Sequence, residues 1–214
     1  MAHVLLATKN PGKLREMREI AAGLPIVWHG LAEFPEVAEA EETGATFAEN
    51  ARLKALHYAS ATGMDTLADD SGLEVDALGG APGVHSARYA GEPHDDGANN
   101  RKLVKALAGV PVERRGARFR CAMALVRGGV VVRETSGAVE GAIVDEPRGT
   151  NGFGYDPHFW LADLQRTMAE LPAEQKNARS HRGQALRAML REIEGLFRAQ
   201  GAWGIGEAEP MDGR

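Results

Sequence analysis

The sequence predicts an α/β protein, because patterns typical of strands and of helices alternate along most of its 214 residues. A short apolar run at residues 4–7 is followed by a loop and then by apolar residues at helical spacing. Residues 46–62 carry a second helical pattern, and residues 117–126 alternate in the way of a half-buried strand. Buried strands beside amphipathic helices indicate a sheet covered by helices.

The first strand, loop and helix contain a possible anion site. Asn10 is suited to cap the helix, and Pro11 is suited to its first position. The free N–H groups and the dipole of that helix would face the loop, with Lys9 and Lys13 beside them. The loop therefore either binds phosphate or is only a capped helix with solvated lysines. It is not a Walker A loop, because the Gly-x-x-x-x-Gly-Lys-Ser/Thr pattern is missing.

The next elements lead to a pair of acids. A strand is expected at residues 26–28, followed by an irregular acidic segment that contains Glu36, Glu39, Glu41 and Glu42. This segment is either a solvated loop or supplies a carboxylate that completes a metal site. Thr46 and Glu49 form a capping box, which opens a helix that ends at Gly63 and serves mainly to build the core. A further strand at residues 66–68 then leads into the acids.

Asp69 and Asp70 stand at the end of that strand, before Ser71 and Gly72. Such a pair can hold a divalent cation or take a proton from water. The alternative is an Asp-Asp-Ser-Gly turn whose side chains bond only the local backbone. If the strand continues through the pair, alternation sends the two side chains to opposite faces of the sheet.

The second half predicts mainly sheet, with a hairpin at Gly128-Gly129. Further elements are expected at residues 99–107 (a helix), 130–135 (a strand), 136–144 (a strand broken by its glycines at 137 and 141), 168–171 (a short helix) and from Ser180 onward (a long capped helix containing Leu186, Leu190, Ile193 and Phe197).

Two later segments combine groups that could recognise a nucleotide. The glycine-rich stretch at residues 149–157 carries Phe153, Tyr155 and Asp156, which could stack on a base and read its edge. It could equally be a hairpin with its aromatic rings in the core. The cationic groups Lys176, Arg179, His181 and Arg182 follow within seven residues, either on the surface or beside an anion.

Composition limits the possible partners. The net charge of −5 gives no general attraction to nucleic acid or to anionic membranes, so neither is expected as a partner. The single cysteine, Cys121, excludes an intrachain disulfide and fits a reducing compartment. The N-terminus does not resemble a signal peptide, and no apolar run approaches the ~18 residues of a membrane span. We therefore expect a soluble, cytoplasmic protein.

Seven segments resemble, in the same order, the signature segments of the inosine triphosphate pyrophosphatase family, also called Ham1-like proteins. They lie at residues 8–13, 41–44, 46–51, 68–73, 79–83, 153–157 and 180–183. The resemblance covers residues 3 to about 198.

The resemblance implies a long, curved mixed sheet flanked by helices, with two lobes, a nucleotide groove between them, and a homodimer. Residues 1–200 would form this domain, and the tail at 201–214 is expected to be poorly ordered. The implied reaction is Mg²⁺-dependent hydrolysis of the non-canonical purine triphosphates ITP, dITP and XTP to the monophosphate and pyrophosphate. It would remove deaminated purines from the nucleotide pool.

The resemblance also implies roles for individual residues. Asp70 corresponds to the general base, and Glu41 and Asp70 correspond to the metal-binding acids, whereas Asp69 is expected to play a supporting part. The implied substrate-binding set is Thr8, Lys9, Asn10, Pro11, Gly12, Lys13, Ser71, Phe153, Gly154, Tyr155, Asp156, Lys176, His181 and Arg182. Lys9 stands where many relatives have glycine, which adds charge near the phosphates.

Two other functions fit parts of this pattern. The first is a Maf-type pyrophosphatase acting on pyrimidine or modified nucleotides, against which the segments at residues 153–156 and 180–182 argue. The second is a nucleotide- or RNA-binding module without catalysis. Asp70 argues against it, because a carboxylate beside phosphates brings no benefit to a simple anion-binding protein.

Overall fold

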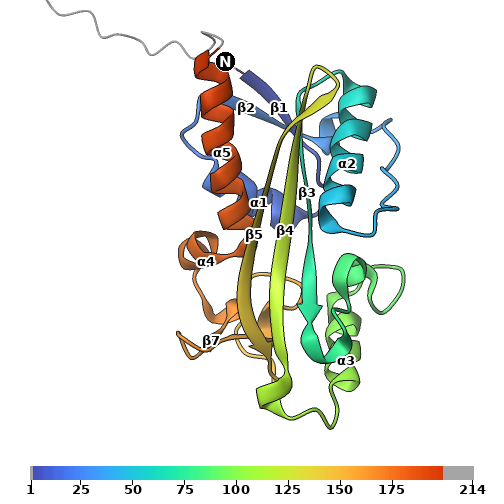
Figure 1. Ribbon diagram of the computed structural model, residues 1–214, viewed down its shortest axis with the longest axis vertical. Coiled ribbons are helices and arrows are strands. Elements are labelled where there is room, and N and C mark those ends of the chain that lie inside the picture. Colours follow the sequence, from blue (N-terminus) through green and yellow to red (C-terminus); the bar gives the residue numbers. More distant parts are fainter. Residues whose placement is uncertain (1, 200–214) are drawn as a thin grey trace, which may run out of the picture.

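The computed structural model describes residues 2–199, which form one open, mixed sheet of seven strands with helices on both faces (Figure 1). The strands are β1 (Ala2–Leu6), β2 (Ile26–Gly30), β3 (Thr66–Val75), β4 (Gly116–Arg127), β5 (Val130–Ile143), β6 (Phe159–Leu161) and β7 (Arg166–Thr167). The helices are α1 (Pro11–Ile20), α2 (Phe47–Thr62), α3 (Asp96–Ala106), α4 (Ala173–Arg179) and α5 (His181–Ala199). This architecture confirms the predicted fold class.

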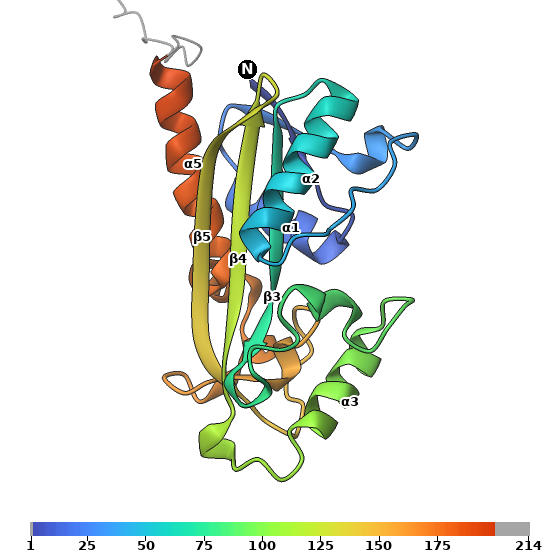
Figure 2. The same cartoon turned by 45° about the vertical axis from the view of Figure 1, so that its right-hand side comes forward.

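The sheet is parallel at one end and antiparallel through its centre. Its strand order is β2-β1-β3-β4-β5-β6-β7. β1 pairs in parallel with β2 and β3, whereas each later pair is antiparallel. The predicted hairpin at Gly128-Gly129 is confirmed, because Arg127 of β4 pairs with Val130 of β5. The long strands β3, β4 and β5 connect the two ends of the molecule (Figure 2).

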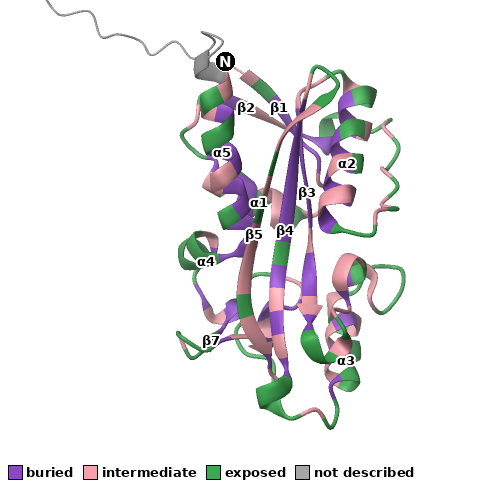
Figure 3. Ribbon diagram, viewed as in Figure 1, coloured by how far each residue is buried: buried purple, intermediate pink, exposed green. Residues whose placement is uncertain are grey.

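Three apolar clusters hold the helices on the sheet. α1 and α5 cover one face, with Met17 and Met189 in the cluster, and α2 covers the other face, with Ala51 and Tyr58. At the opposite end, α3 packs with β6 around Phe159. Figure 3 shows that burial follows β4 along most of its length. The predicted amphipathic helices are thus the elements that build the core.

The predicted helix starts are largely confirmed. The side chain of Asn10 accepts a hydrogen bond from the N–H of Lys13, and Thr46 and Glu49 form the expected capping box. The hydroxyl of Ser180 accepts from the N–H of Gly183 at the start of α5. α3 begins at Asp96, three residues before the predicted start, because Asp95 caps it there.

The interpretation of the acid pair as a turn, or as the end of a strand, is wrong. β3 continues without interruption from Thr66 to Val75 and is paired with β4 along its whole length. The pairing partners of Asp69 and Asp70 are Met123 and Ala122, so the acids lie in the middle of a central strand. Their side chains therefore project to opposite faces of the sheet, as alternation requires.

The predicted break at glycines 137 and 141 is also wrong, because β5 is continuous over Val130–Ile143. At Gly137, a Cβ atom would lie 2.3 Å from the carbonyl oxygen of His181, so glycine allows α5 to approach the strand. Because β6 pairs only with the last two residues of β5, most of this edge of β5 has no neighbouring strand. α5 lies along that edge and protects it, with Thr135 donating a hydrogen bond to the carbonyl of Ala185 at 2.9 Å (Figure 1).

The connection into α5 differs from the prediction. The expected helix at residues 168–171 is a single 3₁₀ turn, and α4, which follows Pro172, was not predicted. The predicted tail at residues 201–214 lies outside the described residues, as does the side chain of Phe197. Among the helices of residues 2–199, none is long and apolar enough to cross a membrane.

Candidate active site

A cleft of about 290 Å³ lies where the loop after β1, the middle of β3 and the segment at residues 153–156 meet. Its lining is rich in cationic groups, contributed by Lys9, Lys13, Lys54, Arg88, Lys176 and Arg182. Carboxylates stand among them, from Glu39, Glu42, Asp70, Asp96 and Asp156. This mixture suits a polyanionic ligand that is bound together with a cation or a reacting water.

The N-terminus of α1 forms one wall of the cleft. Thr8 accepts a hydrogen bond from the N–H of Asn10 at 3.2 Å, which shapes the loop. Lys13 points from the first turn to Asp69, with Nζ 2.9 Å from Oδ2, whereas Lys9 pairs with Glu39 at the exposed rim. Cations therefore reinforce the positive end of the helix dipole on this side of the cleft.

Asp70 is buried on the face of the sheet that α2 covers. Lys54 donates to its Oδ1 at 3.0 Å, and Asn50 donates to its Oδ2 at 3.2 Å. The same Lys54 ammonium lies 2.9 Å from Oε1 of Glu42. Burial raises the pKa of Asp70, and the neighbouring Lys54 offsets part of that rise. A buried carboxylate with a raised pKa is a stronger base than an exposed one.

Asp69 is buried on the opposite face, between α1 and α5. Its Oδ2 contacts Lys13, accepts from the Ser71 hydroxyl at 3.2 Å and lies 3.6 Å from Nε of Arg182. Burial alone would raise the pKa of Asp69, but Lys13 and Arg182 outweigh this effect and hold it well below the usual range. Asp69 is therefore an ionised counter-charge that fixes two cations of the cleft.

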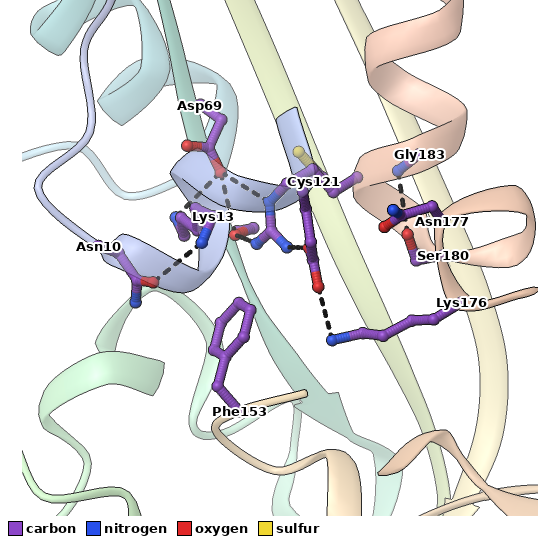
Figure 4. A network of polar contacts seen from close by, with 12 residues as sticks. Asn10, Lys13, Asp69, Cys121, Phe153, Lys176, Asn177, Ser180 and Gly183 are labelled. Atoms are coloured by element: carbon purple, nitrogen blue, oxygen red, sulfur yellow. Dashed lines mark hydrogen bonds and ion pairs between the residues drawn. The ribbon is translucent and has the colours of Figure 1, made fainter. Parts of the chain in front are cut away.

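Glu16 is a second buried acid that fixes cations, and it lies on α1 behind the cleft. Its carboxylate contacts Arg182 and lies 2.7 Å from Nζ of Lys176. Lys176 also contacts Oδ2 of Asp156 at 2.6 Å, and its ammonium lies 4.7 Å from the centroid of the Phe153 ring. Figure 4 shows Phe153 lying between Lys13 and Lys176. The result is an aromatic face held among buried cations.

His181 adds a second ring to the cleft. It stacks on Phe119, with ring centroids 4.9 Å apart and planes inclined by 14°. Burial and the nearby Arg182 hold its pKa well below the usual value, so the imidazole is neutral at pH 7. Its buried Nδ1 has no hydrogen-bond partner among the described residues. A neutral ring with one unpaired nitrogen suits recognition of a flat heterocycle better than binding of phosphate.

The structure brings together most of the predicted site. The predicted residues that line the cleft are Thr8, Lys9, Asn10, Lys13, Asp70, Ser71, Phe153, Gly154, Tyr155, Asp156, Lys176, His181 and Arg182. Pro11 and Gly12 do not line it, although Gly12 packs against Phe153 so closely that a Cβ atom would lie 2.6 Å from the ring. Tyr155 is mainly a core residue, and its hydroxyl donates to the Ser86 carbonyl at 2.8 Å.

Glu41 does not lie beside Asp70. Its side chain is exposed and does not line the cleft, whereas the adjacent Glu42 does and shares Lys54 with Asp70. Sequence reasoning also missed Asn50, Lys54 and Glu16. Asn50 and Lys54 are one helical turn apart on α2, a signal that was available in the spacing, but the helix was interpreted as a core element.

The donor set around Asp70 fits a hard cation. Carboxylate oxygens of Glu42 and Asp70 lie within 3.0 Å of the same Lys54 ammonium, so the two acids already converge on one positive charge. Residues 2–199 contain no group of three or more His, Cys, Asp or Glu side chains that could hold a metal ion by themselves. Mg²⁺ needs only one or two carboxylates where phosphate oxygens and water supply the other ligands. The site therefore fits a Mg²⁺ ion that binds together with phosphates.

The fold and the cleft define an α/β protein with a site for a phosphorylated ligand and a buried carboxylate beside it. The Ham1 family pattern matches residues 4–192, and the chain belongs to this family. It is 54% identical over 192 residues to the dITP/XTP pyrophosphatase of Geobacter sulfurreducens, which covers 90% of this chain and 96% of that protein. The dITP/XTP pyrophosphatase of Listeria monocytogenes is 51% identical over 193 residues, with 90% and 95% covered.

The fold comparison agrees with the sequence comparison. The structure of a HAM1 protein from Coxiella burnetii matches with a TM-score of 0.83 at 45% identity, covering 91% of this chain and 100% of the other. The Ham1 protein of Staphylococcus aureus matches with a TM-score of 0.81 at 40% identity, covering 91% and 99%. The predicted family resemblance is confirmed.

Proposed function

We propose that this protein hydrolyses non-canonical purine nucleoside triphosphates (ITP, dITP and XTP) to the monophosphate and pyrophosphate. The observation that carries the proposal is the cleft, whose lining combines the buried Asp70 with a set of cations suited to a polyphosphate. The relatives named dITP/XTP pyrophosphatase, about half identical over most of this chain, support the substrate class. The reaction would remove deaminated purines from the nucleotide pool.

In this proposal the phosphates lie along the N-terminus of α1. The ammonium of Lys13 and the positive end of the α1 dipole attract the phosphate oxygens, with Lys9 at the outer end. Ser71, which accepts from Arg182 at 3.0 Å, offers a hydroxyl contact beside them. These groups hold the substrate still while a water molecule attacks.

Asp70 acts as the general base. Lys54 and Asn50 fix its two oxygens, so the carboxylate is already oriented before substrate binds. It takes a proton from the water as the oxygen of that water bonds to phosphorus at the α–β anhydride link. The bond to the bridging oxygen breaks, and pyrophosphate leaves.

We propose Mg²⁺ as the cofactor, held by Asp70 and by Glu42 in place of Glu41, the acid that the family resemblance implies. The position of Glu42 beside Lys54 and Asp70 supports this change, because Glu41 is exposed outside the cleft. When bound, Mg²⁺ neutralises negative charge on the phosphate oxygens.

The base would lie against Phe153 and His181, near Lys176 and Arg182. These cations carry only donors, and they can face the O6 atom of hypoxanthine or xanthine. Adenine places an amino group at that position, so two donors would face each other and remain unpaired. On this arrangement we expect a 6-oxo purine to be preferred to adenine.

Pyrophosphate release tests this function. We expect ITP, dITP and XTP to be hydrolysed with a kcat/KM at least about 10²-fold above that for ATP, because the donors facing O6 would be unpaired with adenine. EDTA should abolish turnover, and added Mg²⁺ should restore it. Equal rates on ATP and ITP would contradict the specificity. A preference for pyrimidine triphosphates would favour the Maf-type function, and nucleotide binding without hydrolysis would favour a binding module.

We further propose that residues 1–200 form one two-lobed catalytic domain and that the protein is a cytoplasmic homodimer. The free, buried thiol of Cys121 fits a reducing compartment. The homodimer is the arrangement that the family resemblance implies. Sedimentation equilibrium at micromolar concentration should give twice the chain mass of 22.9 kDa. A single species at the chain mass would contradict the dimer.

A further inference from the structure

Lys54 is the central charge of a closed polar network at the bottom of the cleft. It is only 8% exposed, and its ammonium contacts Oε1 of Glu42 at 2.9 Å and Oδ1 of Asp70 at 3.0 Å. Both distances are those of ion pairs, so this ammonium is the shared counter-charge of the two acids. One lysine thus lies between the two carboxylates that the proposed function assigns to the metal, and its single positive charge offsets only one of their two negative charges.

The network also fixes where these acids stand. Asn50, which is 1% exposed, donates to Oδ2 of Asp70 and accepts from the N–H of Gly44 at 2.7 Å. Gly44 follows Glu42 by two residues, so Asn50 ties the acidic segment to β3. The two carboxylates are therefore held near each other whether the charge between them is a lysine or another cation.

From this geometry we infer that Lys54 occupies the position of the divalent ion, between Glu42 and Asp70, as long as the protein is free of ligand. The ammonium leaves this position when the nucleotide brings the divalent ion. This inference rests on the proposed function and adds an order of events to it. A divalent ion alone must displace a buried ammonium from both acids, which leaves that ammonium unpaired. A triphosphate removes this cost, because Lys54 lines the cleft and can turn to a phosphate oxygen.

Metal binding by the protein without nucleotide tests the inference. Mn²⁺ serves as the probe, because it prefers the same oxygen ligands as Mg²⁺ and its free form is measured by electron paramagnetic resonance. We expect Lys54→Met to bind Mn²⁺ at least about tenfold more tightly than the wild type, because a positive charge next to the ligands has been removed. Lys102→Met is the matched control: it causes the same change in net charge, but Lys102 lies outside the cleft, with its ammonium over the Tyr89 ring. The Mn²⁺ affinity of Lys102→Met should equal that of the wild type.

A second substitution shows where the gained ion binds. Adding Glu42→Gln to Lys54→Met should remove most of the gain in Mn²⁺ affinity, because one of the two carboxylates is lost. An unchanged or weaker Mn²⁺ affinity in folded Lys54→Met would overturn the inference, as would an equal gain in Lys102→Met. Circular dichroism establishes folding, and Lys54→Gln replaces Lys54→Met if the latter does not fold.

The wild type gives an independent result. Its Kd for Mn²⁺ without nucleotide should be millimolar or weaker, and a low micromolar value would overturn the inference whatever the variants do. None of these measurements requires turnover. Failure of wild-type protein to release pyrophosphate from any triphosphate would therefore count against the proposed function alone, and unchanged Mn²⁺ affinity would count against the role of Lys54 alone.

Discussion

Asp70→Asn should lower kcat for ITP hydrolysis by about 10²–10⁴-fold, the usual contribution of a general base. The amide keeps the shape of the side chain but cannot take a proton from water. The fold should be retained, because Lys54 still has Glu42 as its partner and burial disfavours the ionised form of Asp70. Steady-state pyrophosphate release at saturating ITP and Mg²⁺ measures the loss, and thermal unfolding verifies the fold.

The matched control for this substitution is Asp163→Asn. Asp163 is an exposed partner of Arg179 in the turn before β7 and does not line the cleft, so kcat should not change. A folded Asp70→Asn protein with more than about a tenth of wild-type kcat would contradict the assignment of the base, since it would retain more activity than such a loss allows. A large loss in Asp163→Asn would show that the assay reports stability instead of chemistry.

Local patterns predicted most elements because their causes are local. The Asn10 cap, the Thr46 capping box and the glycine pair between β4 and β5 each depend on a few neighbouring residues, and all three are confirmed. The continuity of β3 through Asp69 and Asp70 could not be found in this way. Two adjacent acids followed by serine and glycine are typical of a turn, and only the partners on α1, α2 and α5 make them stable within a central strand.

The candidate site shows the same division between features with local causes and features that depend on distant residues. Most cations and aromatic residues of the cleft could be found in motifs, together with the acids Asp69 and Asp156, whereas Glu16 and Lys54 were not. Glu16 has no unusual sequence context, and its importance comes from Lys176 and Arg182, more than 150 residues away in the chain. The choice between Glu41 and Glu42 depends on which side chain reaches Lys54 on α2, and spacing alone does not decide this. Long-range ion pairs are set by the fold, so adjacent acids with equal local character can have different environments.

Asp69, the other acid in the middle of β3, gives the second large expected effect, which is on stability and not on catalysis. Asp69→Asn should destabilise the protein by about 3 kcal/mol at pH 7, because removal of one partner leaves buried cations without their counter-charge. Lys13 and Arg182 both lose a carboxylate, although Arg182 keeps Glu16. Urea unfolding at pH 7 measures the difference. Asp163→Asn, which breaks only an exposed pair, should change stability by less than about 0.5 kcal/mol.

The pH dependence of this destabilisation identifies its cause. The pKa of Asp69 is lower in the folded protein than its ordinary value of 3.8, so the folded state prefers the ionised form. Its contribution to stability is therefore complete above about pH 5 and declines as the pH falls below the unfolded value toward the folded one. The free energies of unfolding of wild type and Asp69→Asn should differ by the same amount at pH 7 and pH 5, and this difference should be smaller at pH 3. A difference in the free energy of unfolding that stays constant down to pH 3 would mean that Asp69 stabilises the fold by packing or neutral hydrogen bonds. The ion pairs with Lys13 and Arg182 would then not be what holds the cleft cations in place.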